Sequence, residues 1–205
     1  MRVLITAGPT REYLDDVRFL SNPSTGAMGF ACAEAAARAG HRVTLVTGPS
    51  ALRDPRGVTV IRVTSALEMR AAALKAYRSS DAVIATAAVS DYRPAVRLRG
   101  KMKKGPPRVS LALVKTPDIL GEMGRKKGDR ILIGFALETR DEVAHALAKL
   151  ASKRLDHVVL DSPDAFGAGR IDATVIHADR SQESFRRIAK RELAKLLVGL
   201  LGARD

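Results

Sequence analysis

Cysteine is nearly absent from the sequence, and this shortage bears on both compartment and chemistry. The 205 residues include one cysteine, Cys32, so no disulfide can form within the chain. A protein without disulfides suits a reducing compartment, and we expect this one to be cytoplasmic. Because Cys32 lies in an alanine-rich stretch with helical spacing, we expect a buried packing position for it instead of a reactive thiol.

Aromatic residues are also scarce, at 4% of the chain, and tryptophan is missing, although hydrophobic residues as a whole reach 46%. The core must therefore be filled mainly by alanine, valine and leucine. A chain of this length can bury a sizeable core, and no linker or repeat divides it. We expect a single domain that covers residues 1–205.

Long apolar runs are lacking too. No segment approaches the roughly 18 consecutive apolar residues of a membrane-spanning helix. The apolar run at residues 3–7 is too short for the hydrophobic region of a signal peptide. We therefore expect a soluble protein that has no membrane partner.

Acidic residues are outnumbered: 35 lysines and arginines face 22 aspartates and glutamates, giving a formal charge of +13. An excess of this kind favours anionic partners such as phosphates, nucleotides or nucleic acid, but it also fits a solvated arginine-rich surface. A nucleic-acid-binding module usually adds stacking aromatic residues or a recognisable reader fold. Neither is present in the sequence, so we expect no nucleic-acid partner and keep such a module only as an alternative.

Short apolar runs alternate with segments of helical spacing along most of the chain. The pattern predicts strands at residues 3–7, 42–46, 58–63, 81–86, 109–114, 131–135, 157–160 and 173–177. It predicts helices at residues 26–38, 66–77, 117–124, 140–153 and 182–201, with Ser65 as an N-cap. A long loop at 9–25 and a polar, basic flap at about 94–107 interrupt the alternation. We predict an α/β fold, a Rossmann-like three-layer sandwich with a mostly parallel sheet.

Ligands of open α/β sheets bind beyond the carboxyl ends of the strands, and two motifs lie at such ends. Residues 21–29 (SNPSTGAMG) open a helix with small polar residues and two glycines, which suits an anion but also an ordinary helix cap. Residues 87–94 (AAVSDYRP) follow a buried strand and carry Asp91, either a ligand-binding or a turn-capping carboxylate. The dinucleotide fingerprint is incomplete, because the second strand ends without the ribose-binding acid. We therefore keep an NADPH-dependent reductase on the same sheet only as the enzymatic alternative.

Two groups of lysines could bind a polyphosphate. Residues 101–104 (KMKK) lie in the flap, which could close over a ligand, although a solvated charge run has the same pattern. Lys149 and Lys153 are four residues apart on a predicted helix and so share one face, where an anion between them would relieve their repulsion. A solvated helix face explains this pair equally well. The four histidines have no metal-ligand spacing, and the sequence leaves any metal ligands unknown.

Together, these motifs resemble those of phosphopantothenate–cysteine ligases of coenzyme A biosynthesis. The resemblance covers about residues 2–160 and rests on the segments TAGPTRE (6–12), VRFLSN (17–22), GAMG (26–29), AAVSDYRP (87–94), KMKK (101–104), KTPDIL (115–120) and GFALET (134–139). It implies a ligase that activates 4′-phosphopantothenate as an acyl-nucleotide, releases pyrophosphate and joins the acyl group to cysteine. CTP with Mg²⁺ is the implied co-substrate, with ATP as the alternative.

The resemblance also assigns roles to residues. Asn22 would position the carboxylate, and the flap residue Lys101 would steady negative charge, so both are expected to be catalytic. The substrate would be bound by Arg18, Ser24, Gly26, Gly29 and Ala88, with Arg18 reaching its phosphate from across a dimer interface. The nucleotide would be bound by Ala85, Thr86, Ala87, Asp91, Pro117, Asp118, Ile119, Leu120, Phe135, Lys149 and Lys153.

Two positions depart from the family pattern: Ala27 stands where the helix-opening loop often has a basic residue, and Asp161-Ser162 replaces a frequent Asn-Asp. Many relatives carry a flavin-dependent decarboxylase half, which this sequence does not contain. The resemblance therefore implies a stand-alone ligase that binds no flavin, forms a homodimer and has the decarboxylase as a separate partner.

Overall fold

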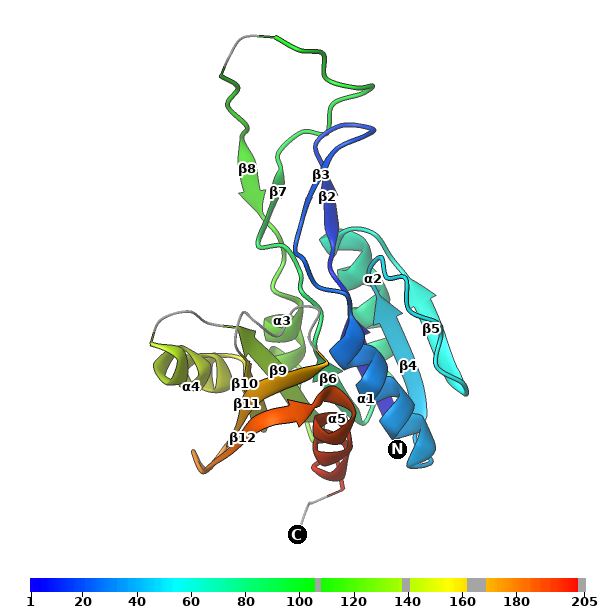
Figure 1. The fold of residues 1–205 in the computed structure, drawn as a ribbon, viewed down its shortest axis with the longest axis vertical. Coiled ribbons are helices and arrows are strands. Elements are labelled where there is room, and N and C mark those ends of the chain that lie inside the picture. Colours follow the sequence, from blue (N-terminus) through cyan, green and yellow to red (C-terminus); the bar gives the residue numbers. More distant parts are fainter. Residues whose placement is uncertain (106–107, 138–140, 162–168, 203–205) are drawn as a thin grey trace.

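The computed structural model describes residues 1–105, 108–137, 141–161 and 169–202, and is organised around an eight-stranded sheet (Figure 1). In spatial order its strands are β12 (Gln182–Ala189), β11 (Arg170–His177), β10 (His157–Asp161), β9 (Ile131–Leu137), β6 (Ala82–Ala85), β1 (Arg2–Ala7), β4 (Arg42–Thr47) and β5 (Val58–Arg62). The six strands from β10 to β5 are parallel, and only β11 and β12 add antiparallel pairings. The predicted mostly parallel sheet is confirmed.

Helices cover both faces of this sheet. Helices α1 (Ala27–Arg38) and α5 (Lys190–Gly199) pack on one face, and α2 (Ala66–Tyr77), α3 (Ile119–Arg125) and α4 (Glu142–Ser152) on the other. Each face of the sheet has its own hydrophobic core, and strand β1 contributes to both, because Val3 and Ile5 face α1 while Leu4 faces α2. The alternation of side chains along buried strands thus produces the predicted Rossmann-like three-layer sandwich.

Cys32 lies in the core between α1 and the sheet and is fully buried. Burial raises the pKa of its thiol to about 12, because the apolar surroundings disfavour a thiolate. The expected packing role is confirmed.

The predicted closing helix at 182–201 is wrong over its first part, since residues 182–189 form strand β12 and helix α5 begins at Lys190. The helical spacing there arises from a β-bulge: Phe185 and Ile188 are three residues apart, yet both pack against the core. They pair with Ala173 and Ile171, which are only two residues apart, and Arg187 takes up the extra residue with a φ of 48°. The bulge gives a strand the i, i+3 apolar pattern of a helix.

Two hairpins project from the carboxyl edge of the sheet and form an arm (Figure 1). One pairs β2 (Arg11–Tyr13) with β3 (Phe19–Ser21), inside the predicted loop at 9–25. The other pairs β7 (Tyr92–Pro94) with β8 (Leu113–Lys115), at the base of the flap. The strand predicted at 109–114 is therefore wrong in position, because pairing begins only at Leu113 and lies outside the main sheet.

Helix starts follow local capping. The Ser65 side chain accepts a hydrogen bond from the Glu68 amide, so its predicted N-cap role is confirmed. Helix α3 begins at Ile119, two residues later than predicted, because Asp118 is its N-cap. The start of the helix predicted at 140–153 falls on Arg140, outside the described residues, and α4 is described from Glu142.

Across the described residues, no helix combines the length and the apolar character that crossing a lipid bilayer requires.

Candidate functional site

The strand order reverses next to β1, and this reversal locates the candidate site. From β1 the chain moves outward through β4 and β5, then returns to the other side of β1 for β6, β9 and β10. Such a switch point leaves a crevice at the carboxyl ends of the strands. The loops after β1 and β6 meet there, where the Ala88 amide donates a hydrogen bond to the Gly8 carbonyl at 3.0 Å.

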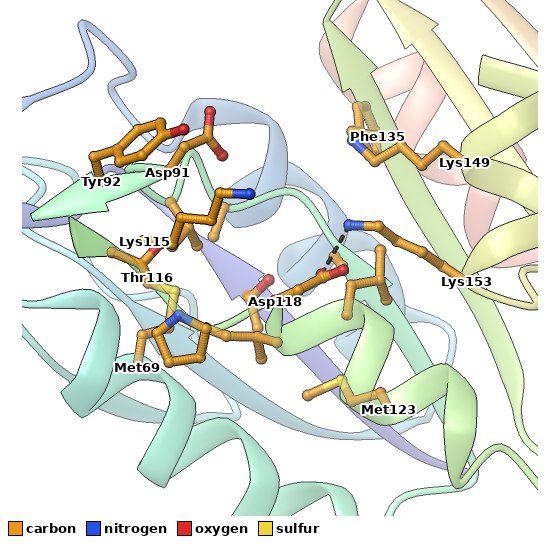
Figure 2. A pocket seen from close by; sticks show the side chains of 17 residues that line it. Met69, Asp91, Tyr92, Lys115, Thr116, Asp118, Met123, Phe135, Lys149 and Lys153 are labelled. Atoms are coloured by element: carbon orange, nitrogen blue, oxygen red, sulfur yellow. Dashed lines mark hydrogen bonds and ion pairs between the residues drawn. The ribbon is translucent and has the colours of Figure 1, made fainter. Parts of the chain in front are cut away.

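A cavity of about 490 Å³ opens beside this switch point, between the sheet edge, the arm and helices α3 and α4 (Figure 2). It is lined by Thr6, Met69, Ala85, Ala87, Val89, Asp91, Tyr92, Lys115, Thr116, Pro117, Asp118, Ile119, Leu120, Met123, Phe135, Lys149 and Lys153. Its size suits a small organic ligand, and three lysines among its walls favour an anionic one.

The cavity brings together ten of the eleven residues to which the family resemblance gives a nucleotide-binding role. They come from four segments far apart in the chain: Ala85, Ala87 and Asp91 from the end of β6 and the loop after it, the 117–120 stretch from the start of α3, Phe135 from β9, and Lys149 and Lys153 from α4 and its C-cap. The eleventh, Thr86, does not line the cavity, because its hydroxyl donates to the Thr6 carbonyl at 2.8 Å.

Lysines and carboxylates alternate around the cavity. Lys153 forms an ion pair with Asp118 at 2.7 Å, drawn as a dashed line in Figure 2. Burial opposes ionisation of Asp118, but the hydrogen bonds from Lys153 and from the Gly121 amide outweigh it and hold the pKa of this carboxyl below its ordinary value. Asp118 thus starts α3 and also fixes Lys153 at the cavity wall.

Replacing Asp118 with Asn is expected to remove a pH-dependent part of the stability. Because the folded-state pKa of Asp118 is depressed, its contribution is present above the ordinary aspartate pKa and is lost as pH falls through the folded-state pKa. The Asp118 side chain is 53% exposed, so solvent screens its interaction with Lys153 and we expect about 0.5 kcal/mol at neutral pH. Urea unfolding of both proteins between pH 7 and pH 2 should give a difference that shrinks to zero; a constant difference would contradict this.

Four of the five predicted substrate-binding residues lie on the α1 side of the same switch point, next to this cavity but not among its lining residues: Ser24, Gly26, Gly29 and Ala88. Gly26 precedes α1 with a φ of 82°, and a Cβ there would come within 3.2 Å of the Gly8 backbone. Asn22 reaches the same place from the loop before α1, donating its side-chain amide to the Ala88 carbonyl at 3.0 Å. Ser24 accepts a weak hydrogen bond from the Gly26 amide. Asn22, Ser24, Gly26 and Ala88 therefore surround the start of α1.

Gly29 is a packing glycine in this arrangement, and Gly29→Ala is expected to destabilise the fold. A Cβ at this position would lie 2.4 Å from the Ala7 Cβ and 2.5 Å from the Thr86 hydroxyl oxygen, so either α1 or the ends of β1 and β6 must shift. Overpacking of this kind costs about 1–3 kcal/mol. Urea unfolding should show the loss, whereas Gly199→Ala, at the end of helix α5 where a Cβ meets no atom within 4 Å, should show none. Equal effects would contradict the packing role.

Arg18 and Lys101, the remaining predicted site residues, lie on the arm. Arg18 forms an ion pair with Asp15 at 3.1 Å and donates to the Met102 carbonyl, while its Nε is buried with no hydrogen-bond partner among the described residues. Lys101 is exposed on the flap and does not line the cavity. Among described residues, no cluster of three histidine, cysteine or acidic side chains could hold a metal ion.

Comparison with known proteins assigns the family. The model of the DNA/pantothenate metabolism flavoprotein C-terminal domain matches residues 1–203, nearly the whole chain. The chain belongs to this family. It is 51% identical over 168 residues to the coenzyme A biosynthesis bifunctional protein CoaBC of Bacillus subtilis, a match that covers 82% of this chain and 41% of that protein.

Solved structures agree with this family. A crystal structure of the C-terminal domain of CoaBC has a TM-score of 0.84 and 38% identity, covering 97% of this chain and 92% of that one. A Cab2 mutant in complex with phosphopantothenate-cysteine has a TM-score of 0.79 over 97% of this chain and 85% of that one, but at 16% identity it shows the shared fold alone. The chain spans about half the length of the curated relatives it matches.

Some residues that line the cavity in this family member had no role assigned from the sequence. Lys115 and Thr116 belong to the KTPDIL segment, which supported the resemblance, yet only its last four residues were assigned to a site. The Thr116 hydroxyl donates to the Ser90 carbonyl and its amide to the Asp91 carbonyl, so it joins the two walls of the cavity. This contact depends on the pairing of β7 with β8, which a local sequence pattern does not predict. Thr6, Met69, Val89, Tyr92 and Met123 also went unassigned.

Three residues of the motifs named above lie outside the described residues: Glu138 and Thr139 of the GFALET segment, and Ser162 of the Asp161-Ser162 departure. Ala27, the other departure, is the first residue of α1 and is half-buried.

Proposed function

We propose that the chain is a phosphopantothenate–cysteine ligase that joins 4′-phosphopantothenate to L-cysteine through an acyl-nucleotide. The carboxylate of the substrate attacks the α-phosphorus of a nucleoside triphosphate, forming an acyl phosphate bond and releasing pyrophosphate. The cysteine amine then attacks the acyl carbon, the amide forms, and the mononucleotide leaves with the bonding electron pair. The observation that carries this proposal is the convergence of ten assigned nucleotide residues on one cavity, in a member of the CoaBC C-terminal domain family.

The reaction must bring a negatively charged carboxylate close to a triphosphate, and positive charge around the cavity would reduce the repulsion between them. Lys149 on α4 and Lys153 at its C-cap face Lys115 on β8 across the cavity, so positive charge comes from two sides (Figure 2). Helix α1 has no side-chain N-cap hydrogen bond, so the backbone amides of its first turn add donors for an anionic group next to Asn22. Asn22, held to the Ala88 carbonyl, would orient the reacting carboxylate between these two regions.

CTP is the proposed nucleotide, with ATP as the alternative, and Mg²⁺ is the proposed metal. Magnesium usually binds through substrate phosphates and one or two carboxylates, keeping several waters. Asp91 and Asp118 line the cavity and fit this requirement, since no dedicated cluster of protein ligands is needed. A magnesium ion bound with the nucleotide would supply charge neutralisation for the displaced pyrophosphate.

The arm supports the proposed homodimer. Among the described residues of its two hairpins and of the segment that joins β7 to β8, nine large hydrophobic side chains are exposed: Val17, Phe19, Tyr92, Val96, Leu98, Val109, Leu111, Leu113 and Val114. A clustered apolar surface of this kind is typical of a protein interface. A second copy seated on the arm would bring its Arg18, with the unsatisfied Nε, near the neighbouring site as the phosphate contact. The flavin-dependent decarboxylase is proposed as a separate partner.

Pyrophosphate release measured without cysteine tests the first half of the proposal. We expect release that requires both 4′-phosphopantothenate and a nucleoside triphosphate, faster with CTP than with ATP and dependent on Mg²⁺. NADPH oxidation by the same sample tests the reductase alternative, and we expect none. Pyrophosphate release that is independent of 4′-phosphopantothenate would contradict the proposal.

A further inference from the structure

The tip of the β2–β3 hairpin holds the middle of the flap through two adjacent carboxylates, Asp15 and Asp16. Asp15 is fully buried at this tip, and its Oδ1 accepts the Val17 and Arg18 amides at 2.7 and 2.8 Å. Its Oδ2 accepts the amide of Met102, 87 residues further along the chain, at 3.1 Å. The Val17 hydrogen bond, with those of Arg18 and Met102, holds the pKa of Asp15 below its ordinary value despite burial.

Asp16 holds a second point of the flap. Its Oδ2 accepts the Gly100 amide at 2.7 Å, and its Oδ1 forms an ion pair with Arg97 at 2.9 Å. The Leu98 amide donates to the Leu14 carbonyl at 2.9 Å. Alternate flap amides, those of residues 98, 100 and 102, are therefore all accepted by the hairpin tip, much as a neighbouring strand would accept them.

We propose that Asp15 and Asp16 are positioning residues that fix the flap backbone on both sides of Lys101. This inference rests on the proposed function, in which Lys101 acts on the reacting groups. Gly100 and Met102 flank Lys101, and each donates its amide to one of these carboxylates. Lys101 itself is exposed, so its backbone anchors are what limit where its ammonium group can reach.

The same contacts connect the flap to the proposed phosphate contact. The Arg18 guanidinium donates to the Met102 carbonyl and lies 3.1 Å from Asp15, so Asp15 holds both Arg18 and the flap residue next to Lys101. A role limited to hairpin folding would need only the Val17 and Arg18 amides. Hairpin folding alone does not explain why the Gly100 and Met102 amides, 84 and 87 residues further along the chain, donate hydrogen bonds to these carboxylates.

Limited trypsin digestion of the native chain, without substrates, tests the anchors directly. Cleavage after Lys101 and Lys103, identified by mass spectrometry, reports how often the flap leaves the hairpin tip. We expect Asp15→Asn and Asp16→Ala each to raise this cleavage rate about 10-fold, the effect of losing a charged hydrogen-bond acceptor. Asp54→Ala is the matched control, because it removes an exposed carboxylate paired with Arg62 at 2.6 Å, away from the flap. Its flap cleavage should stay unchanged.

Kinetics then separate positioning from folding. Both variants should lower kcat while the KM for the nucleotide stays within about 2-fold, because the cavity residues are untouched. Because Asp16 is 53% exposed, the Asp16→Ala variant should fold, and it tests the proposal even if Asp15→Asn does not fold. Unchanged flap cleavage would overturn the proposal, and so would faster cleavage with unchanged kcat. An inactive unmodified chain would instead contradict the proposed function, leaving the digestion result as an independent measure of the anchors.

Discussion

Lys101→Gln is expected to lower turnover by roughly 10²-fold, the usual loss when one preorganised charge-stabilising donor is removed from a reacting centre. Lys101 is exposed and makes no hydrogen bond or ion pair within the described part of the chain, so folding should not depend on it. The expected effect therefore falls on kcat, with the free energy of unfolding unchanged. Steady-state kinetics with saturating nucleotide, together with urea unfolding, measure both quantities.

Lys103→Gln is the matched control for this prediction. Lys103 is also exposed and lies in the same basic run, two residues further along the flap. Removing its charge changes the electrostatics of the flap as a whole by the same amount. Equal losses of kcat in the two variants would contradict a specific role for Lys101 and would indicate only a general effect of flap charge.

Asn22→Asp is expected to lower kcat by roughly 10²-fold or more, with a smaller change in the KM for 4′-phosphopantothenate. The Asn22 side chain donates to the Ala88 carbonyl at 3.0 Å. An aspartate there would lose the donor, turn a negative charge toward that carbonyl, and repel the reacting carboxylate and the nucleotide. The damage should thus fall on the chemical step more than on binding.

Gln182→Glu makes the same amide-to-carboxylate change at an exposed position of the edge strand β12 and should leave kcat unchanged. Tracking pyrophosphate release in single-turnover conditions assigns the Asn22→Asp loss to the first step. A variant that retains normal kcat but binds substrate poorly would contradict the positioning role of Asn22.

Much of the fold follows from local patterns in the sequence. Strand β1 is predicted correctly because its buried apolar run needs both faces covered, and helix α2 because Ser65 caps it and its apolar spacing faces the sheet. The site at the switch point also follows, since the strand order puts the segments after β1 and β6 at one edge. The resemblance to a ligase family then indicates which side chains at that edge belong to one site.

The parts that sequence patterns miss depend on long-range pairing. Strand β12 carries a bulge at Arg187 that imitates helical spacing, and only its pairing with β11 identifies it as a strand. The β2–β3 hairpin has too few residues for a periodic signal. The contact from Asp15 to Met102 spans 87 residues, so no local pattern reports that the hairpin tip anchors the flap. Lys115 reaches the cavity only because β8 pairs with β7.

Product analysis by mass spectrometry shows whether one site activates the acid and then joins it to cysteine. The purified chain is incubated with 4′-phosphopantothenate, CTP and Mg²⁺, and cysteine is added in a second stage. We predict an acyl-nucleotide and pyrophosphate before the addition, then 4′-phosphopantothenoylcysteine and CMP after it. Pyrophosphate release that never yields the amide on adding cysteine, or a complete lack of turnover with both CTP and ATP, would contradict the account.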